Sequence, residues 1–139
     1  MAPLRVLILC TANSSRSQMA EGLLRHLAGE TLEVYSAGAQ PSQVNPFAIQ
    51  AMAVRGLDIS GHRSKSLTEF LGQPFDYVIT VCDQAAETCP VFPGKAQRLH
   101  WSFPDPAAVI GTSDERLAAF VHVRDDLEAT LRTWYQDLR

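Results

Sequence analysis

The sequence predicts an α/β protein of three layers, in which helices cover both faces of a central, mostly parallel sheet of four strands. Apolar runs with strand character alternate with segments of helical periodicity, a pattern typical of parallel sheets. The length of 139 residues suits one domain, which we expect to span residues 1–139. With 46% hydrophobic and 19% charged residues, the composition excludes disordered and collagen-like classes.

The first elements follow from local patterns. The run at residues 5–9 begins with Arg5 and is otherwise apolar and rich in branched side chains, which predicts a strand buried on both faces. Apolar periodicity over residues 18–28 predicts a helix with Ser17 as its N-cap and Gly29 just past its end. Similar reasoning places the later elements, with Asn45-Pro46 and Thr112–Glu115 as helix starts. They are a strand at 32–35, a helix at 46–56, a short helix at 66–71, strands at 75–81 and 98–101, and a helix from 113 to the end.

The charge pattern narrows the possible partners and location. The net charge is −3 and the basic residues form no block, so the sequence gives no footprint for nucleic acid. No apolar run approaches the roughly 18 residues of a membrane span, and the first apolar run lacks the features of a signal peptide. We therefore expect a cytoplasmic protein that binds neither nucleic acid nor membrane. We also expect it to be a monomer.

A polar loop, residues 10–17, lies between the first strand and the first helix. Loops at the carboxyl end of a parallel strand bind ligands, and backbone amides at a helix N-terminus favour anions. The loop has the form Cys-x5-Arg-Ser, in which the planar side chain of Arg16 can hold two oxygens of a tetrahedral oxyanion. The expected substrate-binding residues are Thr11, Ala12, Asn13, Ser14, Ser15, Arg16 and Ser17.

Cys10 opens this loop. The amides, the helix dipole and Arg16 all favour negative charge there, so we expect the nucleophilic thiolate to be populated, with Ser17 donating a hydrogen bond to it. Asn13 is expected to brace the loop internally. The alternative is that Cys10 merely ends a buried strand, but the complete motif favours the catalytic interpretation.

Two more cysteines follow the strand at 75–81. Cys82 and Cys89 are separated by six residues, a spacing that does not match common zinc motifs, and we expect no metal even with His100 nearby. A redox pair is the stronger interpretation, because disulfide exchange passes oxidation from one thiol to another. A helix over residues 82–89 would separate the two Cα atoms by about 10 Å, beyond the roughly 7 Å that a disulfide allows, so the segment would have to unwind.

The loop resembles that of the low-molecular-weight protein tyrosine phosphatases. The likeness narrows to thioredoxin-coupled arsenate reductases, because three blocks match along nearly the whole chain. They are CTANSSRSQMAEG at 10–22, VCDQAAETCPVFPG at 81–94 and HWSFPDP at 100–106. The resemblance implies the phosphatase-like fold described above, with no tightly bound cofactor.

The resemblance also implies a mechanism. Arsenate, in competition with phosphate or sulfate, would bind against Arg16 and be attacked by Cys10, with Asp105 as general acid. Cys82 would then attack the Cys10 sulfur and release arsenite, and Cys89 would attack Cys82. Thioredoxin would reduce the resulting Cys82–Cys89 disulfide. Without the loop, Asp105 would be interpreted as a turn residue before Pro106.

Some relatives hold potassium behind the loop through residues matching Asn13, Glu21 and Ser36. Here Arg63 and Lys65 lie in the segment that completes that site, and two cations disfavour a third, so we expect no potassium requirement. Glu21 has an alternative interpretation as an ordinary charge on the first turns of a helix.

Two other functions stay open at this point. One is a phosphotyrosine phosphatase, in which Cys82 and Cys89 are protective or incidental; weak phosphatase activity is expected even of a reductase. The other is a redox sensor or anion-binding module in which Cys10 reports oxidation through Cys82.

Overall fold

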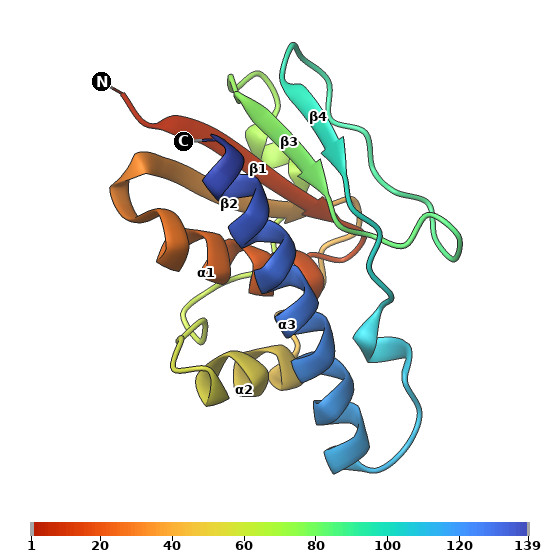
Figure 1. Cartoon of the computed structure of the whole chain (residues 1–139). Coiled ribbons are helices and arrows are strands. Elements are labelled where there is room, and N and C mark those ends of the chain that lie inside the picture. Colours follow the sequence, from red (N-terminus) through yellow and green to blue (C-terminus); the bar gives the residue numbers. More distant parts are fainter. Residues whose placement is uncertain (1, 139) are drawn as a thin grey trace.

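The structure, a computed structural model, describes residues 2–138, in which strands alternate with helices except between the last two strands, which a loop connects (Figure 1). In chain order the elements are β1 (Leu4–Cys10), α1 (Arg16–Ala28), the 3₁₀ helix η1 (Gly29–Thr31), β2 (Leu32–Gly38), α2 (Pro46–Val54), the 3₁₀ helix η2 (Leu67–Phe70), β3 (Tyr77–Thr80), β4 (Gln97–His100), the 3₁₀ helix η3 (Pro106–Ala108) and α3 (Ser113–Leu138).

The sheet has four parallel strands in the order β2-β1-β3-β4, which confirms the predicted α/β class. In the register, Leu9 lies opposite Thr80, and Thr80 lies opposite His100. Because all strands run the same way, the segments that follow β1, β3 and β4 leave the sheet at one edge. The cysteines at 10 and 82 therefore lie at neighbouring strand ends.

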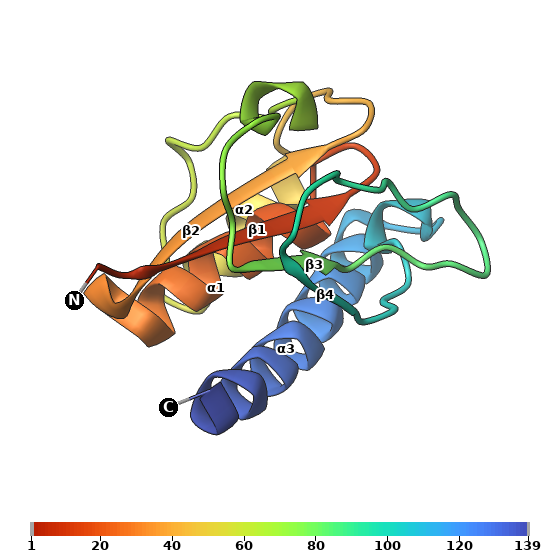
Figure 2. The same cartoon turned by 90° about the horizontal axis from the view of Figure 1, so that it is seen from above.

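Both faces of the sheet are covered, but by unequal layers (Figure 2). On one face, Val6 and Ile8 pack in a core with residues of α1, α2 and α3. On the other face, Leu7 and Leu9 pack with Phe70 of η2 and with the aromatic side chains of Phe75 and Phe92. The apolar run of β1 is continuous because alternate side chains enter different cores. The predicted short helix at 66–71 is a 3₁₀ helix, so this second layer is thin.

Two of the predicted helix starts are confirmed. Asn45 accepts a hydrogen bond from the Phe47 amide at 2.9 Å. The amide of Glu115 donates to Thr112 Oγ1, and the Thr112 amide donates to Glu115 Oε1, each at 3.1 Å, which is a capping box. The expected cap of α1 is wrong, because the helix begins at Arg16 and the Ser17 hydroxyl lies inside it, bonded to other groups.

The last helix, α3, is long and amphipathic. It spans 26 residues and buries one apolar stripe that includes Phe120, Leu127 and Leu131. Its other faces carry charged side chains. In the part of the chain that the structure describes, no helix combines the length and the apolar character needed to cross a membrane.

Candidate active site

The loop between β1 and α1 surrounds a cavity of about 200 Å³ at the carboxyl edge of the sheet. The cavity brings together most of the residues that the sequence singled out. It is lined by Cys10, Thr11, Ala12, Ser14, Ser15, Arg16, Ser42, Glu87, Asp105 and Ala107. Asn13 and Ser17 do not line it, because both point into the interior behind the loop and are fully buried.

Cys10 has a polar partner despite its burial. Its Sγ lies 2.8 Å from Ser17 Oγ, and Asn13 Nδ2 donates to that same oxygen at 2.8 Å. Because Ser17 Oγ already accepts from Asn13, its own proton is free to be donated to the sulfur. A donor aimed at the sulfur stabilises the thiolate, the form that acts as a nucleophile.

Asn13 shapes the loop. Among residues 2–138, it is the one non-glycine residue with a positive φ, of 49°. Asparagine tolerates this conformation better than most residues do. Its Oδ1 accepts from Gln18 Nε2 and from the Lys65 amide, both at 2.8 Å, and its Nδ2 also donates to Ser36 Oγ at 2.9 Å. These bonds tie the loop to α1, to β2 and to the segment before η2.

The Arg16 side chain is buried and only partly satisfied by the protein. Nη1 donates to the Phe103 carbonyl at 3.1 Å, and Nη2 lies 2.8 Å from Glu87 Oε1. Among the described residues, Arg16 Nε and Ser15 Oγ are buried and have no hydrogen-bond partner. Buried donors are normally paired, so these two groups fit a site whose ligand supplies acceptor oxygens.

Glu87 is a site residue that the sequence analysis missed. Its carboxylate pairs with Arg16 and accepts from Thr11 Oγ1 at 3.2 Å, so it occupies the place where an oxyanion would meet the guanidinium. Glu87 lies in the turn formed by residues 82–89, which the Cys82–Cys89 disulfide closes. No local pattern in the sequence signals that long-range contact.

Asp105 lies at the mouth of the same cavity. Its Oδ2 is 3.9 Å from Arg16 Nη2, and its side chain is 38% exposed. The same carboxylate accepts from the Ala107 amide at 3.0 Å and starts η3. Asp105 thus has both roles considered from the sequence. It forms a turn, and it places a carboxyl group beside the anion loop.

Cys82 and Cys89 form a disulfide with their Cα atoms 5.9 Å apart. The segment between them is a turn and not a helix, as a disulfide requires. Cys82 is fully buried, just after β3, and the Val81 amide donates to the Leu9 carbonyl at 2.9 Å. That bond links the chain beside Cys82 to the strand that ends in Cys10. Cys10 itself is free.

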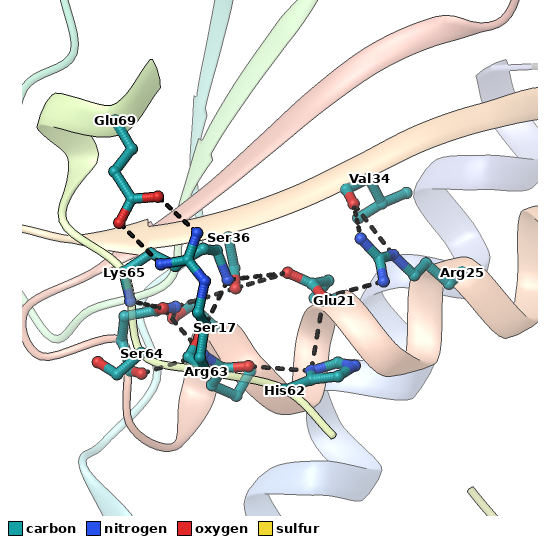
Figure 3. Close-up of polar contacts among 12 residues, drawn as sticks. Ser17, Glu21, Arg25, Val34, Ser36, His62, Arg63, Ser64, Lys65 and Glu69 are labelled. Atoms are coloured by element: carbon teal, nitrogen blue, oxygen red, sulfur yellow. Dashed lines mark hydrogen bonds and ion pairs between the residues drawn. The ribbon is translucent and has the colours of Figure 1, made fainter. Parts of the chain in front are cut away.

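Behind the loop, the Glu21 carboxylate is buried in a polar cluster (Figure 3). It accepts from Ser36 Oγ at 2.8 Å and lies 3.3 Å from Arg25 Nη1 and 3.4 Å from His62 Nδ1. Lys65 Nζ is 3.8 Å from Glu21 Oε1. The interpretation of Glu21 as an ordinary charge on the first turns of a helix is therefore wrong, because its carboxylate is buried among these partners.

The two cations expected near Glu21 behave differently. Arg63 turns outward and pairs with Glu69, with Nη2 and Oε1 2.6 Å apart. Lys65 turns inward, where burial lowers its pKa and Glu21 opposes that shift. Burial also lowers the pKa of His62, again opposed by Glu21. The buried carboxylate is thus matched by cationic and polar groups of the chain itself.

Comparisons with known proteins agree with this geometry. Residues 5–139 match the family described as low molecular weight phosphotyrosine protein phosphatase. An arsenate reductase of Halalkalibacterium halodurans is 43% identical over 129 residues, which cover 93% of both chains. A solved arsenate reductase in the phosphate binding state superposes with a TM-score of 0.82 at 29% identity, covering 98% of this chain and 99% of that one. A thioredoxin-dependent arsenate reductase of Corynebacterium glutamicum gives a TM-score of 0.73 at 30% identity, covering 98% of this chain and 62% of the other.

Replacing Glu87 with glutamine should strengthen anion binding by the disulfide form. The carboxylate and a tetrahedral oxyanion compete for Arg16, and the neutral amide competes less well, so phosphate should bind about tenfold tighter. Calorimetric titration of the oxidised protein with phosphate measures this effect. Glu30→Gln removes the same charge at the far end of α1 and should leave the affinity unchanged; equal affinities in Glu87→Gln and wild type would contradict the competition.

Gly38→Ala should distort the loop. A Cβ atom at this position would lie 2.7 Å from the Asn13 amide nitrogen and from the Thr11 carbonyl oxygen, and backbone atoms do not yield easily. We expect a loss of about 1–3 kcal/mol in unfolding free energy and weaker phosphate binding. Gly61→Ala is the matched control, because a Cβ there meets nothing within 4 Å. Urea unfolding and phosphate titration of both variants make the comparison, and normal binding by Gly38→Ala would show that the close contact does not shape the loop.

Proposed function

Because the chain belongs to the low molecular weight phosphotyrosine protein phosphatase family, we propose that it uses the anion loop of that family to reduce arsenate to arsenite. The observation that carries the proposal is the Cys82–Cys89 disulfide, placed beside the free Cys10 at one edge of the sheet. A phosphatase reaction needs one nucleophilic thiol, whereas a reduction needs two further thiols to take up the oxidation.

In the first step, arsenate binds in the cavity lined by the loop, with Arg16 and the loop amides holding its oxygens. Glu87 leaves Arg16 when the substrate arrives. The Cys10 thiolate attacks arsenic, an arsenic–sulfur bond forms and an arsenic–oxygen bond breaks. Asp105, at the cavity mouth, gives its proton to the departing oxygen, which leaves as water.

The second step transfers two electrons. The Cys82 thiolate attacks the Cys10 sulfur, a disulfide forms between them, and the electron pair of the arsenic–sulfur bond stays on arsenic. Arsenic passes from the pentavalent to the trivalent state and leaves as arsenite. The Cys89 thiolate then attacks the Cys82 sulfur and displaces the Cys10 thiolate, which regenerates the nucleophile.

Thioredoxin would close the cycle by reducing the Cys82–Cys89 disulfide. Cys89 is only half-buried, whereas Cys82 is fully buried, so Cys89 is the sulfur more open to an external thiol. A relay that depends on an external reductant suits the cytoplasm, where thiols are kept reduced. We assign the whole reaction to one domain, residues 1–139, which acts as a monomer and uses no tightly bound cofactor or metal in the reaction.

A phosphatase activity is the second candidate. The loop, the nucleophile and the neighbouring carboxyl group would serve a phosphate ester equally well, because phosphate and arsenate share tetrahedral geometry and charge. We expect this activity to be weak beside the reduction, since it leaves Cys82 and Cys89 without a role.

Arsenate-dependent oxidation of NADPH, measured with thioredoxin and thioredoxin reductase, tests the main proposal. Wild type should turn over repeatedly and Cys10→Ser should be inactive. Cys89→Ser should release about one arsenite per chain and stop as a Cys10–Cys82 disulfide, which mass spectrometry of the thiol-blocked protein detects. Brisk cleavage of an aryl phosphate without any arsenate-dependent turnover would favour the phosphatase, and repeated turnover by Cys89→Ser would overturn the three-thiol relay.

We also propose that potassium is not required, because the Lys65 ammonium lies beside Glu21. Potassium chloride and sodium chloride at equal ionic strength should give melting temperatures within about 1 °C of each other. Lys65→Met should lower the unfolding free energy by about 1–3 kcal/mol, since Glu21 loses a cationic neighbour. Lys95→Met, at an exposed position, is the control. A potassium-specific rise of several degrees in wild type would contradict the proposal.

A further inference from the structure

We propose that the reduced protein binds one zinc ion through Cys82, Cys89 and His100. In the described residues, the two Sγ atoms and a ring nitrogen of His100 all lie within 4.8 Å of one another. Two thiolates and an imidazole are a donor set that zinc prefers. The site needs only the thiol form of the pair, so the proposal does not depend on arsenate reduction.

The orientation of His100 points to a missing ligand. Its Nδ1 lies 2.6 Å from Thr80 Oγ1, a contact that fixes the ring. Its Nε2 is buried and has no hydrogen-bond partner among residues 2–138. Metal-binding histidines commonly use one nitrogen for the metal while the other bonds to a supporting group, and Thr80 supplies that support here.

The two sulfurs become available when the disulfide is reduced. Zinc–sulfur bonds of about 2.3 Å at a tetrahedral angle require the sulfurs to lie about 3.8 Å apart. Side-chain rotations can produce that separation, since the two Cα atoms are already only 5.9 Å apart. On binding, each thiol loses its proton and becomes a ligand, and no electron is transferred.

An ion can also reach the site. Cys89 and His100 line a cavity of about 260 Å³, together with Thr80 and Gln84. This space gives a path from the surface and room for a water molecule as the fourth ligand of a tetrahedral ion. The polar donors, the supporting hydrogen bond and the access path therefore occur together.

The sheet, and not the sequence spacing, creates this site. Six residues separate the two cysteines, and His100 follows eleven positions after Cys89. β4 pairs with β3 so that His100 lies opposite Thr80, two residues before Cys82. Sequence spacing alone disfavours zinc, whereas the pairing of β3 with β4 brings the three donors together.

Zinc at this site would hold the relay in its reduced, inactive form. Thiolates bound to zinc neither attack the Cys10 sulfur nor oxidise readily, so the ion would inhibit turnover and protect the pair. This consequence rests on the proposed function, whereas the binding itself does not.

Competition between the reduced protein and a chromophoric zinc chelator tests the binding directly. We expect one zinc per chain with an apparent Kd below about 1 μM, and at least hundredfold weaker binding by the disulfide form. His100→Gln should weaken binding at least tenfold, and Thr80→Val should weaken it by about tenfold through loss of the supporting contact. His122→Gln, at a position whose side chain is 76% exposed on α3, should bind as wild type does.

Two further variants locate the ion. Cys10→Ser should keep the wild-type affinity, and Cys89→Ser should lose both the affinity and the thiolate-to-metal absorption seen with cobalt in place of zinc. Wild-type affinity in both His100→Gln and Thr80→Val would overturn the three-ligand site, as would loss of binding in Cys10→Ser. If His100→Gln does not fold by circular dichroism, Thr80→Val decides alone. Failure of the arsenate assay leaves these measurements intact, so the two proposals can fail separately.

Discussion

The parallel pairing of β1 with β3 brings the reactive groups of this chain together. The register sets Leu9 opposite Thr80, and the next hydrogen bond runs from the Val81 amide to the Leu9 carbonyl. The two strands therefore end at the same level along the strand direction. Cys10 and Cys82 are therefore neighbours in space although 72 positions separate them in sequence. A shift of the register by one residue would turn the apolar side chains of β1 into the wrong cores, so burial of those side chains also fixes the relation between the thiols.

The loop is then held from behind, by side chains that do not line the cavity. Asn13 connects the Ser17 hydroxyl to Ser36, and Ser36 donates to the buried Glu21 carboxylate. A chain of bonds thus runs from the sulfur of Cys10 to the cluster of charges around Glu21. Figure 3 shows the Glu21 end of this chain. Every member is buried, and an unpaired polar group there would be costly, so the chain favours one conformation of the loop. Two buried polar atoms of the loop have no hydrogen-bond partner among the described residues, Arg16 Nε and Ser15 Oγ, and both belong to residues that line the cavity.

Local patterns were enough to predict the strands, most helix boundaries and the anion loop, because each depends on residues close in sequence. Asn45, for example, caps α2 as expected through its own side chain. The cap at Ser17 was wrong because a tertiary partner, Cys10, engages the hydroxyl. Glu87 and the burial of Glu21 were missed for the same reason: their partners, Arg16, Thr11, His62 and Lys65, are brought close by the sheet and by the long connection before η2. Sequence spacing carries no information on contacts of that kind.

The segment 82–89 connects the redox state of the chain to its anion site. With the disulfide closed, the turn carries Glu87 to Arg16, and a carboxylate there satisfies the same guanidinium that an oxyanion needs. A bound oxyanion and this carboxylate would both bear negative charge in a small, largely buried space, so the two would compete for Arg16. The turn is also held by hydrogen bonds from the Ala86 and Glu87 amides to the Asp83 carbonyl, and reduction of the disulfide would free the Cys82 and Cys89 thiols. In the disulfide form, therefore, the guanidinium that an oxyanion needs is paired with a carboxylate of the chain, and both resolving sulfurs are oxidised, so the same short segment sets the state of the anion site and of the thiol pair.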